Sequence, residues 1–336
     1  MRTIVAAVFL SAALAAPLVA QTADGQSSEG QSTEGPSTED QSTDIAATTP
    51  AADLDAQVAA AREIFIDGDH AAALAVLKPA AEAGHMRAQN IVASAYQYGL
   101  GLPVDAGLAV DFFERAAAQG YPPAMHNLGV LFETGMEGLA PDPLAARDWY
   151  GRAAALDYPP SLGGIGALLH DGTGGPADPA AALVYFRRGA EMGDPTSLEW
   201  LAYMTGEGEA GLTADLDESR RLYTIAAMLG RGYSQNRLGE MLERGEGGPR
   251  DLPAALDHYR QAAHMGYVYG AINAAWAITE NPDEFPDQVE GLAWCFWALD
   301  HATPEEAADY APSCNDLAEG FSETERREAL KRAGTL

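Results

Sequence analysis

The fold is decided by residues 124–154, which read AMHNLGVLFETGMEGLAPDPLAARDWYGRAA. Leu128, Leu131 and Phe132 recur at helical spacing and predict a first helix. That helix is expected to end at Gly135, because glycine readily takes the left-handed conformation found just beyond a helix C-terminus. The Gly-, Pro- and Asp-rich stretch that follows predicts a short loop and the start of a second helix. The segment therefore predicts a helical hairpin.

The same pattern recurs along the chain. It aligns in the segments 88–120, 124–157, 161–193, 197–230, 234–266 and 270–301. Eleven residues into each segment comes a glycine or, in the last, an asparagine: Gly99, Gly135, Gly172, Gly208, Gly245 and Asn281. Later in each segment comes an aromatic residue: Phe113, Tyr150, Phe186, Tyr223, Tyr259 and Trp294. A period of 36 or 37 residues maintained in this way indicates a repeat protein rather than two globular domains.

A single hairpin cannot bury both of its faces, but stacked hairpins can. We therefore predict an all-α fold, a right-handed α-solenoid of stacked helix-turn-helix repeats of 36–37 residues. A degenerate hairpin over residues 56–84 brings the number of repeats to about seven, and these fill residues 54–301. Residues 302–336 are predicted to form C-terminal capping helices, with helix starts at Thr303 and Ser322.

The repeat resembles the Sel1-like repeat, a relative of the tetratricopeptide repeat. In one segment the resemblance rests on Ala124, Leu128-Gly129, Phe132, Gly135, Asp142, Ala146, Trp149-Tyr150 and Ala153-Ala154. Segment 234–266 matches similarly, and the resemblance covers residues 56 to about 301. The last repeat departs from it, because Asn281 replaces the glycine and residues 280–286 lack the Gly-rich loop. The resemblance implies a scaffold or regulator that binds other proteins, as periplasmic Sel1-like regulators do.

The N-terminus has the layout of a secretory signal peptide. Arg2 precedes an apolar run over residues 4–18, and small residues precede the polar Gln21. A transmembrane anchor is the alternative, but the run is short for a hydrocarbon core of about 30 Å. We expect residues 1–20 to be removed, which leaves no transmembrane segment and a periplasmic or secreted protein. Residues 21–53 are small, polar and acidic, and are predicted to form a disordered acidic linker.

Charge limits the possible partners. The chain carries a formal net charge of −29, so it repels phosphate backbones and nucleic acid is not an expected partner. Most of the acidic residues lie within the repeats rather than in the linker. This distribution favours a basic or neutral protein or peptide of the cell envelope as the partner of a chain that we expect to be monomeric.

The chain has two cysteines. Cys295 lies near the end of the last repeat, at a position that is mostly polar in the other repeats, and Cys314 lies on the first capping helix. An outward-facing Cys295 could reach a helix packed across it. In an exported protein we therefore predict a disulfide between Cys295 and Cys314. The alternative is two free, buried thiols.

No pattern of catalytic or metal-binding residues is evident. The seven histidines form no His-x-x-x-His or His-Glu-x-x-His motif, and His170 is expected to cap a helix C-terminus. Residues 215–218 resemble the start of a calcium loop, but Arg220 occupies the position at which such a loop needs glycine. Neither Lys78 nor Lys331 follows a serine at the spacing of a Ser-x-x-Lys nucleophile, and no Gly-x-Ser-x-Gly elbow occurs. We predict a protein that is not an enzyme, with no cofactor and no metal.

The expected binding surface is the concave face formed by the first helices of the repeats. Nine residues predicted to lie off the core there are candidates for contact with a partner: Asn90, His126, Glu199, Trp200, Tyr203, Asn236, Arg237, Asn273 and Trp276. Trp200 and Trp276 could anchor the partner, since aromatic residues dominate interface hot spots, or could fill gaps between repeats. A binder or enzyme acting on β-lactams or peptidoglycan, like the cysteine-rich Sel1-like proteins, is the alternative function.

Overall fold

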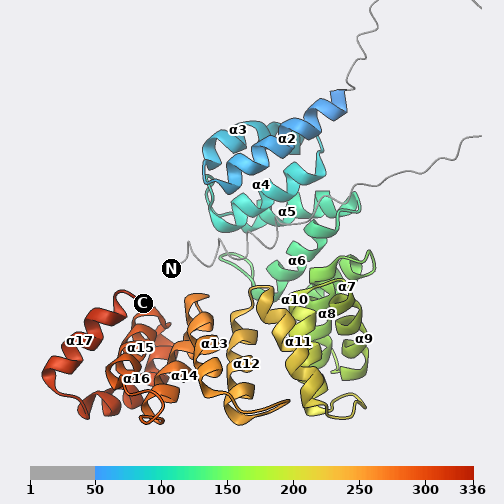
Figure 1. Ribbon diagram of the computed structural model, residues 1–336. Coiled ribbons are helices and arrows are strands. Elements are labelled where there is room, and N and C mark those ends of the chain that lie inside the picture. Colours follow the sequence, from blue (N-terminus) through green and yellow to red (C-terminus); the bar gives the residue numbers. More distant parts are fainter. Residues whose placement is uncertain (1–49) are drawn as a thin grey trace, which may run out of the picture. The chain divides into compact units, whose positions relative to one another are not determined.

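A computed structural model describes residues 50–336 and contains helices in consecutive pairs (Figure 1). The predicted signal peptide and most of the predicted linker lie outside the described residues. The chain divides into two compact units, with the boundary between Leu156 and Asp157. The helices of the first unit are α2 (Pro50–Ile66), α3 (His70–Glu82), α4 (Met86–Tyr98), α5 (Ala106–Ala118), α6 (Pro122–Thr134) and α7 (Pro143–Ala154).

The second unit continues the pattern of paired helices and adds the two helices of the C-terminal cap. Its helices are α8 (Pro159–Asp171), α9 (Pro179–Glu191), α10 (Pro195–Glu207), α11 (Leu216–Met228), α12 (Gly232–Arg244), α13 (Leu252–His264), α14 (Val268–Thr279), α15 (Gln288–His301), α16 (Pro304–Glu319) and α17 (Glu323–Ala333). Within the second unit, each helix from α8 to α15 packs against the next along the chain, and α17 folds back onto α15. In addition, α10 contacts α8 and α12 contacts α14. The prediction of an all-α solenoid of stacked hairpins is confirmed.

The first hairpin is longer than the sequence predicts. Its first helix, α2, was expected to begin near Ala56 but begins at Pro50. The helix therefore includes the last residues of the segment predicted to be linker. The cause is local, because the alanine-rich stretch after Pro50 has high helix propensity and proline is favoured in a first helical turn.

The repeated glycines end the first helices, as predicted. Gly99, Gly172, Gly208 and Gly245 are left-handed C-caps with φ between 70° and 74°. Gly135 also ends its helix, but its ψ of −178° lies outside the left-handed helical region that was predicted for it. The last repeat has no such glycine, and α14 instead ends at Glu280 in a right-handed conformation. Its loop therefore differs from those of the other repeats, although its two helices are intact.

Aromatic residues of the second helices fill the gap between the helices of each hairpin. Phe113, Phe186, Tyr223 and Tyr259 are each at most 1% exposed. In the third segment, residues 161–193, Phe186 lies so close to Gly166 of α8 that a Cβ on this glycine would come within 2.5 Å of the ring. The small residues of the first helix therefore set the distance between the paired helices.

The cap is attached to the last repeat covalently and by polar contacts. Cys295 of α15 and Cys314 of α16 form a disulfide with Cα atoms 5.7 Å apart. Both residues are fully buried, because α16 covers the face of α15 on which Cys295 was expected to point outward. The predicted starts at Thr303 and Ser322 each form a capping box.

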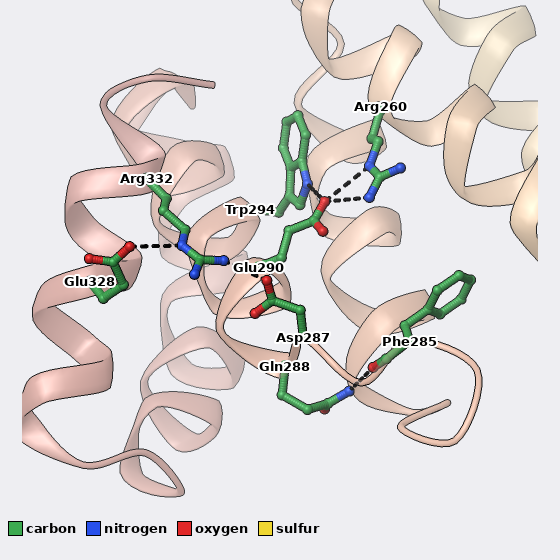
Figure 2. A network of polar contacts seen from close by, with 8 residues as sticks. All are labelled: Arg260, Phe285, Asp287, Gln288, Glu290, Trp294, Glu328 and Arg332. Carbon is green, nitrogen blue, oxygen red and sulfur yellow. Dashed lines mark hydrogen bonds and ion pairs between the residues drawn. The ribbon is translucent and has the colours of Figure 1, made fainter.

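Side chains at the start of α15 link it to α13 on one side and to α17 on the other (Figure 2). Glu290 accepts hydrogen bonds from the Arg260 Nε atom at 3.1 Å and from the Trp294 indole at 3.2 Å. Asp287 forms an ion pair of 2.7 Å with Arg332 of α17. These contacts hold the cap in register with the last repeat.

Candidate functional site

The nine candidate residues all lie on first helices, but the structure does not place them on one open surface. Asn90, Glu199 and Asn236 are buried, at 2%, 7% and 3% exposure, so the prediction that they lie off the core is wrong. The physical reason is that the first helix of the next repeat covers this side of each first helix. The other six candidates are partly buried.

The asparagines connect neighbouring repeats. The Asn127 side-chain amide donates to the Asn90 Oδ1 atom at 2.9 Å, and the Asn273 amide donates to the Asn236 Oδ1 atom at 2.8 Å. Each bond joins positions 37 residues apart, on adjacent first helices. Side-chain amides with such partners stabilise the packing of one repeat on the next and are not open to a ligand.

Three further candidates make packing or ion-pair contacts with other side chains of the fold. The His126 ring lies 5.3 Å from the Tyr150 ring, and burial lowers its pKa well below the usual histidine range. Trp276 packs against the hydrophobic core of the last repeats. Arg237 forms an ion pair with Glu240 and lies over the Tyr223 ring, with the guanidinium carbon 5.9 Å from its centroid.

The remaining candidates, Glu199, Trp200 and Tyr203, come together at a pocket in the second unit. They lie on α10 and line a cavity of about 440 Å³. The rest of the lining comes from His170 and Asp171 at the end of α8 and from Tyr233 in the first turn of α12. The pocket thus spans three successive first helices, and its size is in the range of small-molecule and side-chain sites.

Aromatic packing fixes the wall formed by Trp200. The Phe186 ring stacks on the indole, with centroids 5.4 Å apart and planes 7° from parallel. The His170 ring lies 4.7 Å from the indole, and the Tyr203 ring meets it edge-on at 6.0 Å. Because the indole is held on several sides, the pocket is formed before any partner arrives.

His170 makes polar contacts that the sequence did not predict. It was expected to cap the carbonyls at the end of α8, but its Nδ1 atom lies 2.6 Å from the Asp171 carboxylate and its Nε2 atom lies 2.9 Å from that of Glu209. Burial disfavours the charged ring, but the hydrogen bonds to Asp171 and Glu209 outweigh it and raise the pKa of His170. The imidazole therefore links the end of α8 to the loop that follows α10.

Glu199 is held at the other side of the pocket. Its carboxylate pairs with Arg231 at 2.6 Å and accepts a hydrogen bond from the Ser234 hydroxyl at 2.7 Å. Both partners belong to the start of the next repeat. The buried charge is thus compensated, which explains why a glutamate can lie at a position where no other segment has an acidic residue.

The pocket lies where a contact found in the second and fifth segments is missing. In the second and fifth segments, the aromatic residue is a tyrosine whose hydroxyl donates to a glutamate nine residues into the segment. These pairs are Tyr150 with Glu133 and Tyr259 with Glu243, each at 2.7 Å. The glutamate therefore stays within its own hairpin in those repeats.

The third and fourth segments lack this pair in two different ways. In the third, Phe186 has no hydroxyl and the glutamate position holds His170, which can turn toward the next repeat. In the fourth, Tyr223 is present but Gly206 replaces the glutamate. Within residues 50–336, the buried Tyr223 hydroxyl has no hydrogen-bond partner. The sequence contained this signal, but it appears only when one repeat is compared with the others.

The pocket combines charged and aromatic side chains, an arrangement that is suited to binding. The lining side chains are an imidazole, two carboxylates and three aromatic rings, without a serine, cysteine or lysine nucleophile among them. In the described part of the chain, no group of three or more His, Cys, Asp or Glu residues could hold a metal ion. None of the helices between residues 50 and 336 is long and apolar enough to cross a membrane.

Comparison with known proteins identifies the repeat. The family model described as "Sel1 repeat" matches residues 87–121, 122–158, 161–194, 195–230 and 232–267, which is more than half of the chain. A Sel1 repeat protein from Oxalobacter formigenes has a solved structure that is similar to this chain, with a TM-score of 0.61 and 25% identity. The alignment covers 70% of this chain and 96% of that protein.

A protective antigen of uropathogenic Escherichia coli, described as having an SLR fold, is also similar. The TM-score is 0.57 and the identity 26% over 84% of this chain. The alignment covers 61% of the antigen's solved chain, so part of that protein has no counterpart in it.

Proposed function

Because this chain belongs to the Sel1 repeat family, we propose that it is an exported, non-catalytic scaffold or regulator that binds a protein of the cell envelope through its first helices. The observation that carries the proposal is the preformed pocket of Glu199, Trp200 and Tyr203 on α10. Aromatic residues held in place by their neighbours are typical anchors of protein interfaces.

Export is part of the same proposal. The apolar N-terminal run predicts a signal peptide, and the disulfide between Cys295 and Cys314 is of the kind that persists in oxidising compartments. We expect the protein to be recovered from the periplasm or medium with Gln21 as its first residue. Intact mass measurement of the fractionated protein tests this, and a cytoplasmic protein that retains residues 1–20 would refute it.

Site-specific photocrosslinking tests the interaction directly. A photoreactive phenylalanine replaces Tyr203 at the pocket or, as a control, the 65%-exposed Val184 on the second helix α9. We expect irradiation of cells to give a discrete protein adduct from position 203 and none from position 184. Adducts of equal yield from both positions, or none from either, would argue against binding through the first helices.

A further inference from the structure

The pocket on α10 has a selective charge pattern. Asp171 and Glu199 contribute carboxylates to its lining, and Glu209 lies at its edge against His170. The two basic groups at the site, His170 and Arg231, are each already bound to these carboxylates. The site therefore has three carboxylates but only two basic side chains of its own chain to pair with them.

Aromatic rings surround this excess negative charge. Trp200, Tyr203 and Tyr233 all line the cavity. Aromatic faces attract ammonium and guanidinium groups, and the attraction is stronger where water is partly excluded. A partner anion, in contrast, would meet the carboxylates, so the site favours a cation.

A row of tyrosines leads away from the pocket across the following repeats. The Tyr233 ring, 38% exposed, meets the Tyr267 ring edge-on at 6.0 Å. Tyr267 is 5.4 Å from Tyr269, which is 43% exposed, and Tyr269 meets Tyr310 of the cap at 5.4 Å. Exposed rings in contact with one another form a surface on which an extended chain can lie.

From this geometry, and building on the proposed function, we propose that the pocket takes up an arginine or lysine side chain of the partner, whose chain then runs over Tyr233, Tyr267 and Tyr269. The occupant follows from charge complementarity. The whole protein is acidic, with a net charge of −29, and the cavity is lined by two carboxylates, three aromatic rings and the His170 imidazole, which is itself bound to carboxylates. A basic side chain satisfies both at once.

Short peptides test this without knowledge of the partner. The probes are acetylated, amidated Ala-X-Ala peptides in which X is arginine, lysine, citrulline or glutamate, titrated into the full-length mature protein. The readout is the indole NMR signal of Trp200, assigned by its loss in the Trp200→Phe variant. We expect the arginine and lysine peptides to shift this signal with a Kd of about millimolar, as suits a single side chain. The citrulline and glutamate peptides should leave it in place.

Charge variants supply the control. Glu209→Gln should weaken binding of the arginine peptide several-fold, while Asp217→Asn, which changes net charge equally at an exposed position on α11, should not. An equal shift from citrulline, or no shift from arginine, would overturn the proposal. So would a shift from N,N′-diacetylchitobiose alone, which would assign the site to a glycan. If the arginine and lysine peptides cause no shift while position 203 still crosslinks to a protein, only this inference is refuted. If these peptides bind but no adduct forms at position 203, only the proposed function is refuted.

Discussion

Single residues set how closely the helices of a hairpin approach. Gly166 on α8 faces the ring of Phe186, and no Cβ fits between them. The Gly166→Ala variant must therefore push the helices apart or distort the ring, at a cost of about 1–3 kcal/mol of unfolding free energy. Urea unfolding measures this loss as a lower midpoint.

Gly151 on α7 provides the matched control for this prediction. It is also a helical glycine, but a Cβ added there meets nothing within 4 Å. Gly151→Ala should therefore stabilise by about 0.5–1 kcal/mol, because alanine has the higher helix propensity. Equal effects of the two substitutions would show that close packing at Gly166 is not the constraint.

His170 makes the stability of the folded protein depend on pH. Its pKa is raised by Asp171 and Glu209, so the folded protein holds this proton more tightly than the unfolded chain does. The resulting stabilisation is fully present below the unfolded pKa of about 6.5 and is lost as the pH rises through the higher folded value. The stability difference between the wild type and His170→Gln should therefore be larger at pH 5.5 than at pH 8.5.

The comparison between variants isolates this residue. Burial lowers the pKa of His126 and His258, so both destabilise the protein on acidification, but they do so equally in wild type and variant. Unfolding free energies from urea titrations at the two pH values give the difference. A gap between the variants that does not change with pH would mean that His170 acts only by packing.

At the scale of the element, the second helices begin in the same way, except α15, whose N-cap Asp287 makes no capping hydrogen bond. The aspartates Asp105, Asp142, Asp178, Asp215 and Asp251 are N-caps whose carboxylates accept a hydrogen bond from the backbone. Asp178→Ala should cost about 0.5–2 kcal/mol of unfolding free energy and Asp178→Ser much less. Thermal unfolding of the two variants distinguishes them; equal losses would show that the side-chain oxygen does not matter.

The helices could be predicted from the sequence because they depend on local signals. Spacing of apolar residues, the capping aspartates and the terminal glycines located nearly every helix. The site was only partly predictable. Glu199, Trp200 and Tyr203 were sequence candidates and line the pocket, although Glu199 is buried. His170 was assigned to helix capping and Tyr233 was missed, because their contacts depend on neighbouring repeats. Asn90 and Asn236 were placed on the surface because the covering helix comes from another repeat.

At the scale of the whole molecule, stability at the C-terminus depends on the cap. The disulfide between Cys295 and Cys314 closes a loop with a sequence separation of 19 residues. In the chain-entropy model such a loop contributes roughly 3 kcal/mol. The Cys295→Ala/Cys314→Ala variant should lose about this much, and hydrogen exchange should increase mainly in α14 to α17, since each repeat contacts only its neighbours.

Reduction of the wild-type protein is the internal control. It should reproduce the exchange pattern of the double variant, and a reducing agent should have no effect on that variant. Faster exchange spread evenly over residues 50–336 would show instead that the units unfold together and that the cap acts on the whole chain.

The missing Tyr–Glu pair of the third and fourth segments has a consequence for modularity. The second and fifth segments satisfy their own tyrosine with a glutamate of the same hairpin. Residues 161–233 are different, since they contain every residue that lines the pocket. Duplicating a repeat outside this stretch would lengthen the protein and leave the pocket unchanged. Residues 161–233 could be transferred as one segment into another repeat protein of the same period.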